Sequence, residues 1–404
     1  MLEKSIVKDC FVFLLILCSL LFFSAKFATS GILKNFAYAY MLLTIILSFP
    51  HFFKYSGGFV FPIKIISFSV LLSIFMAYVN WGQGFGDSLS AVPYLIWFVF
   101  FYLMQIQYPV YKVEKIILLF GCLYVVLFLF QFIYSDHVYF GFNEEFQIDR
   151  GVVRVNFPGA GVFFLAYLIA LIRSKNAEKY RWFFILFIIA GVVVTILQVT
   201  RQSIVLVLLI TLFHYTSKAS LPRRIAILSI FSLGLFFALN SDNPIAHGLA
   251  ETQKKTQTAG AKNIRIRAGE YFLTDFSPNL LSQIFGNGVP NYNSALGQKT
   301  KILKENKGLY LSDVGIIGFY TMFGIFAIIG YIMIFVKSFF IRIPERYIYL
   351  KYYIFYLLAT CLTSDSVYST NFLISNVLVL YCFQRLFVIK RTLGYPILRF
   401  IKSF

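Results

Sequence analysis

The sequence is poor in charge. Of its 404 residues only 13% are Asp, Glu, Lys or Arg, while 59% are hydrophobic and 20% aromatic. Soluble globular domains usually carry about 25% charged and about 45–50% apolar residues. A water-soluble protein of this size would have too few charges to cover its surface. The composition therefore excludes a soluble enzyme, a disordered tail protein and a secreted disulfide scaffold.

Cysteine and histidine are also scarce. The five cysteines all lie within or against apolar stretches, so none can cross-link a loop outside the membrane. They form no CxxC or Cys/His metal pattern, and we interpret them as small buried hydrophobic residues. The sequence therefore predicts neither a metal site nor a cofactor. It also lacks the internal repeat that secondary transporters show.

Long apolar runs recur from Phe11 to Ile389, each close to the ~20 residues needed to cross a bilayer. They predict an all-α polytopic membrane protein with about twelve transmembrane helices, the first of them an uncleaved span. The seventh and eighth spans are joined only by Thr200-Arg201-Gln202, which predicts a tight hairpin. The tenth is overlong, so it is tilted or starts outside the hydrocarbon. The spans lie roughly at residues 9–25, 35–50, 62–80, 90–106, 115–134, 158–173, 182–200, 202–217, 225–240, 309–336, 347–364 and 370–389.

The net charge of +19 is placed in a way that predicts orientation and argues against nucleic-acid binding. Lys and Arg gather in alternate short breaks between the spans, as the positive-inside rule requires of cytoplasmic loops. Both termini are then cytoplasmic, which agrees with an even number of spans. The predicted organisation is residues 1–240 as nine transmembrane helices, residues 241–308 as a large extracytoplasmic loop, and residues 309–404 as three further helices and a cytoplasmic tail.

The loop at residues 241–308 holds nine cations against five acids. This balance can gather an anionic ligand, although a solvated or headgroup-facing loop is the alternative. The loop is expected to be partly helical. The stretch from Glu270 to Ile284 is amphipathic, with its apolar residues spaced for one helical face, although Pro278 interrupts it. Residues 285–290 form a turn cluster that cannot continue a helix.

Four arginines are placed where they could bind an anion. Arg201 lies between two apolar spans with no acid within ten residues, and Arg154 lies just before the sixth span. Ionisable residues near hydrocarbon are functional candidates, but anchoring to headgroups is the alternative for both. Arg265 and Arg267 would point apart in a helix and share one face in an extended segment. Two guanidiniums on one face would suit a diphosphate.

Four segments follow one another between about residue 150 and 330. They are Arg154-Val-Asn-Phe-Pro-Gly159, Thr200-Arg-Gln-Ser203, Arg265-Ile-Arg267 with Ile284-Phe-Gly-Asn-Gly288, and Leu309-Tyr-Leu-Ser-Asp313-Val-Gly-Ile-Ile-Gly318. In order and spacing they resemble motifs of the bacterial O-antigen polymerase and O-antigen ligase superfamily, although Phe157 and Pro158 are adjacent here and the family has Phe-x-x-Pro. These polytopic membrane glycosyltransferases use undecaprenyl-diphosphate-linked sugars.

The resemblance implies a repeat-unit polymerase for a surface polysaccharide such as O-antigen, capsule or exopolysaccharide. It would lie in the bacterial inner (plasma) membrane and transfer glycan between undecaprenyl-diphosphate carriers without a metal. Ligases of the superfamily carry a His-Asn pair where this sequence has Glu305-Asn306, which favours the polymerase branch. Membrane lipid and a chain-length regulator are the further partners it implies.

The roles of single residues follow from this chemistry. Arg201 and Arg265 are expected to hold the lipid diphosphate, with Arg154 and Arg267 as supports.

A carboxylate must take the proton of the acceptor hydroxyl if a side-chain base is used. Asp313 is the first candidate because it lies at the junction of loop and span; a role as a helix cap or first-turn acid is the alternative. Glu305, Glu270 and Asp275 are the other candidates. Tyr292 is expected to bind glycan, or else to pack the loop.

Three other functions remain open at this point. A lipid-linked oligosaccharide flippase has a similar length and span number, but it should show two related halves and short outer loops. An O-antigen ligase is disfavoured by the missing histidine. A structural role without catalysis is the remaining alternative.

Overall fold

The computed structural model describes residues 2–23, 31–140, 148–149, 152–153, 155, 158–176, 180–198, 200–217, 219–240 and 263–393. Three parts of the predicted organisation lie outside these ranges. They are Arg154, the first part of the large loop at residues 241–262, and the tail after residue 393.

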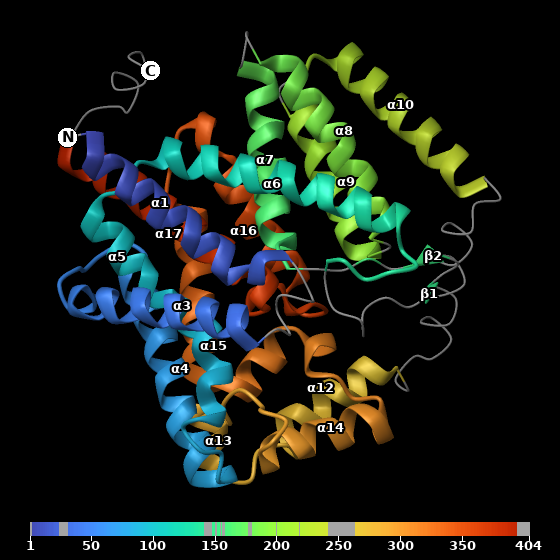
Figure 1. The fold of residues 1–404 in the computed structure, drawn as a ribbon. Helices are drawn as coiled ribbons and strands as arrows, with labels where there is room; N and C mark the ends of the chain where they lie inside the picture. Colours follow the sequence, from blue (N-terminus) through green and yellow to red (C-terminus); the bar gives the residue numbers. More distant parts are fainter. Residues whose placement is uncertain are drawn as a thin grey trace.

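The described residues are almost wholly helical, which confirms the predicted all-α class (Figure 1). The one ladder among them is a two-residue antiparallel pair in which Ile148 is opposite Val153. The elements are α1 (Leu2–Ser19), η1 (Leu21–Phe23), α3 (Gly31–Phe52), α4 (Val60–Trp81), η2 (Asp87–Phe98), α5 (Val99–Ile106), α6 (Val110–Ile133), β1 (Ile148–Asp149), β2 (Val152–Val153), α7 (Ala160–Asn176), α8 (Arg181–Leu197), α9 (Arg201–Thr216), α10 (Leu221–Asn240), α12 (Ile264–Thr274), α13 (Leu280–Phe285), α14 (Ala295–Lys307), η5 (Leu311–Val314), α15 (Ile316–Phe340), η6 (Glu345–Tyr347), α16 (Tyr349–Thr360), η7 (Asp365–Val367) and α17 (Thr370–Leu393).

Six of the described helices are long and apolar enough to cross a membrane: α3, α4, η2 with α5, α6, α15 and α17. Each coincides with a predicted span. The other six predicted spans also fall on helices, namely α1, α7, α8, α9, α10 and α16. Of these, α7 and α8 have 17 residues, α9 has 16 and α16 only 12, against the ~20 that a straight crossing needs. The full count of twelve therefore stays a prediction.

Helix α7 is the centre of the helix bundle and packs against α6, α8, α16 and α17. Every residue from Val162 to Ile172 is at most 4% exposed, as expected for a helix that is apolar on all sides. Glycines on the neighbouring helices allow these helices to approach α7 closely. A Cβ on Gly121 of α6 would lie 2.3 Å from the Ala166 Cβ, and one on Gly191 of α8 would lie 2.6 Å from the Tyr167 ring.

The overlong tenth span is broken at Gly324, whose φ of 78° lies in the left-handed region. The break frees backbone carbonyls of the preceding turn, and the turn cluster at residues 285–290 satisfies them. The Asn287 N–H donates to the Thr321 carbonyl at 3.0 Å, and the Gly288 N–H donates to the Met322 carbonyl at 2.9 Å. The turn cluster thus docks against α15 and α4. The span predicted at residues 309–336 is overlong because it combines η5 with most of α15, which begins only at Ile316.

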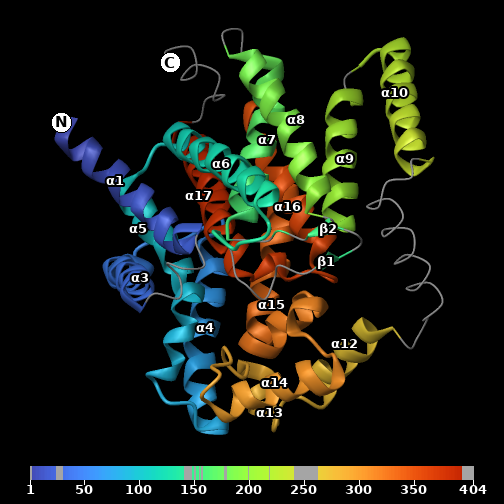
Figure 2. The ribbon, with the colours of Figure 1, turned by 45° about the vertical axis from the view of Figure 1, so that its right-hand side comes forward.

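Residues 263–314 form a small subdomain with its own core, here called the loop subdomain. Figures 1 and 2 place α12, α13 and α14 together at one end of the molecule, beside the C-terminal half of α4. Residues 263–308 of the predicted loop are partly helical, as expected, while their place outside the membrane stays a prediction. The core residues are Ala268, Phe272, Phe276, Leu296, Leu303, Leu309 and Val314.

The single apolar face predicted from Glu270 to Ile284 is wrong, because the chain near Pro278 separates α12 from α13. Phe272 and Phe276 are each 1% exposed, whereas Leu280 and Leu281 are 67% and 55% exposed. Asn279 starts a new helix by accepting the Ser282 N–H at 2.9 Å. The change of helix axis removes the common face.

One cation of the loop has a structural role. The Lys299 ammonium donates to the Phe276 carbonyl at 2.8 Å and lies 4.9 Å from the Trp81 ring centre. Burial, with the positive charge of Lys307, lowers the pKa of Lys299. Lys299 therefore joins α14 to the end of α4.

Candidate functional site

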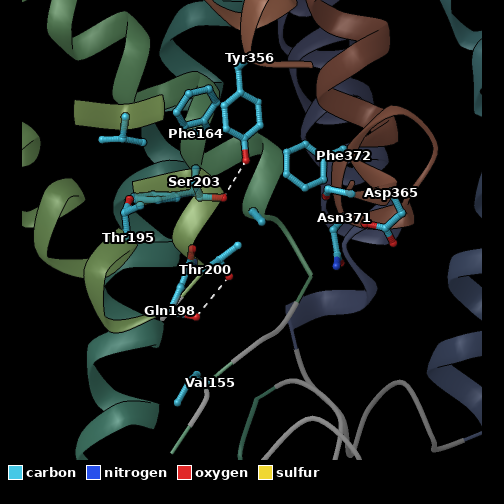
Figure 3. Close-up of a pocket in the computed structure, with 14 residues that line it drawn as sticks. Val155, Phe164, Thr195, Gln198, Thr200, Ser203, Tyr356, Asp365, Asn371 and Phe372 are labelled. Atoms are coloured by element: carbon cyan, nitrogen blue, oxygen red, sulfur yellow. Dashed lines mark hydrogen bonds between the residues drawn. The ribbon is translucent and has the colours of Figure 1, made fainter. Parts of the chain in front are cut away.

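A small polar cavity lies where α7, α9 and α17 begin and where α8 and α16 end (Figure 3). The charge pattern predicts that all of these helix ends face outside. The cavity has a volume of about 120 Å³. Figure 3 shows Asp365 and Asn371 on one side of it and Thr195 and Gln198 on the other. Its polar lining consists of Thr195, Gln198, Thr200, Ser203, Tyr356, Ser364, Asp365 and Asn371.

Two of the segments that resemble family motifs meet at this cavity. Thr200 and Ser203 come from the hairpin between α8 and α9, and Val155 and Ala160 come from the segment that leads into α7. These segments are brought together because α7 packs against α8, and α8 against α9. Their meeting depends on the packing of three consecutive helices.

Polar contacts between α9 and α16 close one wall of the cavity. The Ser203 and Tyr356 hydroxyls lie 3.0 Å apart, and the Gln202 amide donates to the Ala359 carbonyl at 2.8 Å. The Thr363 hydroxyl donates to the Gln202 Oε1 at 2.6 Å. The Phe164 ring lies 4.0 Å from the Tyr356 ring, centre to centre, and supports it from α7. The wall therefore combines aromatic surface with hydroxyl groups.

The turn η7, which carries Asp365, is fixed by a buried polar network. The Asn376 amide nitrogen donates to the carbonyls of Ser366 and Val367 at 3.3 and 3.2 Å. Its oxygen accepts the Tyr353 hydroxyl at 2.8 Å, and the Tyr331 hydroxyl also donates to the Val367 carbonyl. Asn376 is 1% exposed, so its hydrogen-bonding groups are satisfied inside the bundle. The network places the Asp365 carboxylate on a rigid support.

Two hydrogen bonds connect the region around the cavity with the loop subdomain and the start of α15. The Tyr368 hydroxyl donates to the Leu311 carbonyl at 2.8 Å, and the Ile316 N–H donates to the Cys361 carbonyl at 2.5 Å. Burial, with the negative charges of Asp365 and Asp313 among its causes, raises the pKa of Tyr368. Asp365 and Asp313 thus lie on neighbouring elements, with Tyr368 between η7 and η5.

Arg201 is the first residue of α9 and is half-buried, beside the cavity-lining residue Thr200. Arg265 and Arg267 lie in the first turns of α12 and are exposed. The helix turns them to different faces, so the extended pair that would share one face is not found. Asn263 caps this helix by accepting the Arg265 N–H at 2.9 Å. Two cations near a helix N-terminus oppose the helix dipole and concentrate positive potential there.

Asp313 lies half-buried in η5, which packs against both α12 and η7. Asp313 does not cap α15, because the N-cap of that helix is Gly315 and no side chain caps it. It is an acid in the first turn of η5, which agrees with the first-turn alternative. Glu270 on α12, Glu305 on α14 and Tyr292 are exposed, and none of them lines the cavity. The predicted residues on the loop subdomain therefore lie apart from the cavity and connect to it through η5.

Tyr356, Asp365 and Asn371 are among the cavity residues that were not singled out from the sequence. Asp365 does carry a signal, because it is the single charged residue in the short break at residues 365–369. Tyr356 and Asn371 resemble many other residues in apolar segments. Their role becomes visible only when α16 and α17 are placed beside α9 and α7.

No protein-family model, curated protein or solved structure matches the chain.

Proposed function

We propose that this protein is a surface-polysaccharide repeat-unit polymerase, a membrane glycosyltransferase that transfers glycan between undecaprenyl-diphosphate carriers. One observation supports this most. The Thr200–Ser203 hairpin and the segment entering α7 line one polar cavity, and a carboxylate, Asp365, lies on the same cavity. The carboxylate is one group that a sugar transfer from a lipid diphosphate requires. The other is a cation, and Arg201 follows the lining residue Thr200 directly in the chain.

In the proposed reaction the acceptor hydroxyl oxygen attacks the anomeric carbon of the donor glycan. The bond from that carbon to the diphosphate oxygen breaks, and the diphosphate leaves with the electron pair. Arg201 stabilises the developing negative charge, with Arg265, Arg267 and Arg154 as the further cations expected from the resemblance. Fixed cations act where charge develops and need no proton transfer.

The proton of the acceptor hydroxyl passes to a carboxylate. Asp365 is our candidate from the cavity, and Asp313 is the candidate from the resemblance. The aromatic rings of Tyr356, Phe164 and Phe372 supply apolar surface for a sugar ring, while Asn371 and Gln198 supply hydrogen bonds to its hydroxyls.

The proposed function is tested by deleting the gene and analysing the lipid-linked glycans. We expect single repeat units on the outer face and no long polymer. Adding back the parent gene should restore the long polymer. Units trapped on the cytoplasmic face would indicate a flippase. Polymer that forms normally but is not joined to its final lipid would indicate a ligase.

A further inference from the structure

A second, apolar cavity lies on the opposite halves of α9 and α16 from the polar one, and it also borders the end of α15. Its volume is about 490 Å³, within the range of small-molecule sites. On α9 it is lined by Leu209, Ile210 and Phe213, whereas the polar cavity is lined by Ser203 and Val207, so the two cavities follow one another along this helix. We call it the lower groove.

The lower groove opens on the outside of the helix bundle. Phe213 and Phe339 are 61% and 60% exposed, and Phe355 is 46% exposed. On a soluble protein such a surface would be a liability, but α9, α15 and α16 are predicted spans and their outer faces meet hydrocarbon chains. The lining thus fits an extended apolar chain that lies along the bundle.

Lys351 is the one charged residue in the lining of the lower groove. Its ammonium donates to the Phe339 carbonyl at 3.1 Å, where α15 approaches its end. An ammonium carries three donors, so this contact alone does not satisfy it. A cation beside an apolar groove is costly unless an anion or water compensates it.

The segment that leads from α15 to Lys351 on α16 has a net positive charge. Residues 337–351 contain four cations, Lys337, Arg342, Arg346 and Lys351, against one acid, Glu345. Arg342 is exposed and follows Phe339 by three residues. Basic sites between transmembrane helices at the cytoplasmic side bind the headgroups of anionic lipids. An apolar groove with a cation at its end is complementary to such a lipid.

We propose that the lower groove binds one anionic phospholipid of the surrounding bilayer. An acyl chain lies among Leu209, Phe213 and Phe355, and the phosphate accepts hydrogen bonds from the Lys351 ammonium. This proposal does not depend on the proposed function, because no group of the polar cavity takes part in it.

The test uses the purified full chain in detergent, depleted of lipid and titrated with phosphatidylglycerol or phosphatidylcholine of identical acyl chains. Bound lipid is counted by native mass spectrometry. We expect the parent to bind phosphatidylglycerol several-fold more tightly. Lys351→Gln should reduce this preference to nearly one, and Lys351→Arg should keep it. Leu209→Trp fills the groove and should weaken binding of both lipids.

Two control variants lie on α6. Lys115→Gln removes an exposed cation, and Val126→Trp enlarges a residue that is 63% exposed. Both should behave as the parent does. Equal binding of the two lipids by the parent, or an unchanged preference in well-folded Lys351→Gln, would overturn the proposal. A polypeptide that co-purifies in equal amount and is lost in Leu209→Trp would also overturn it, since the groove would then hold a protein.

Discussion

Asp365 on η7 and Asp313 on η5 lie on two elements that contact each other between the polar cavity and the loop subdomain. Both raise the pKa of Tyr368, but only Asp365 lines the cavity. Its backbone carbonyl accepts the N–H groups of Tyr368 and Ser369 at 2.8 and 2.6 Å, which fixes the turn. At the scale of single residues, the question is which carboxylate accepts the proton.

We expect Asp365→Asn to reduce polymer formation about 100-fold, because the amide keeps the shape of the side chain but cannot accept a proton. Asp313→Asn is the matched comparison. Polymer length and amount in cells with equal protein levels are the measurement. Loss in Asp313→Asn with full activity in Asp365→Asn would assign the role to Asp313, and activity in both would mean that neither is the base.

Arg201→Lys keeps the charge at the start of α9 and removes the planar fork that can bind two oxygens. We expect a loss of polymer of about 10-fold or more, because an ammonium lacks the planar fork that forms two parallel hydrogen bonds to the leaving diphosphate. The measurement is polymer amount at equal membrane insertion, with Arg181→Lys at the other end of the hairpin as the control. Activity of Arg201→Lys at the level of the parent would show that this arginine does not bind the diphosphate.

At the scale of elements, the turn cluster and the broken α15 depend on each other. A Cβ on Gly286 would lie 2.2 Å from the Met322 carbonyl oxygen, and one on Gly324 would lie 2.2 Å from the Ile284 carbonyl oxygen. The Asn287 amide also donates to the Thr321 carbonyl and accepts the Trp81 indole N–H at 3.0 Å. The glycines of this motif therefore serve close packing of the backbone.

We expect Gly286→Ala to destabilise the protein by about 1–3 kcal/mol, because its φ of 89° and the backbone contact both exclude a Cβ. Thermal unfolding of the detergent-solubilised protein, followed by size-exclusion chromatography, measures this. The control is Gly86→Ala, where a Cβ would meet nothing within 4 Å and φ is −63°. Equal melting temperatures for the two variants would contradict the packing role.

At the scale of the whole molecule, apolar runs located the helices well, since each predicted span falls on a helix. The break at Gly324 was not predictable, because it lies inside an apolar run and its partner is the distant turn cluster. The hairpin at Thr200 could be found from its polar residues. The position of Asp365 in the cavity could not be found from the sequence, because it requires α16 and α17 to pack beside α7.

The orientation of the chain is a separate prediction at this scale. The alternation of cations places both termini in the cytoplasm and the loop subdomain outside. Alkaline phosphatase fused at Thr258 should therefore be active, and fusions at Lys218 or after Lys402 should be inactive. The reverse pattern would place the polar cavity on the cytoplasmic side and contradict the proposed reaction.

Reconstitution is the most direct measurement of the central claim. The purified full chain in proteoliposomes is supplied with undecaprenyl-diphosphate-linked repeat units, and the glycan products are separated by length. We expect products of two and more repeat units together with free undecaprenyl diphosphate, and neither in the Asp365→Asn, Asp313→Asn double variant. If repeat units cross the bilayer without any gain in length, the protein is a transporter and not a polymerase.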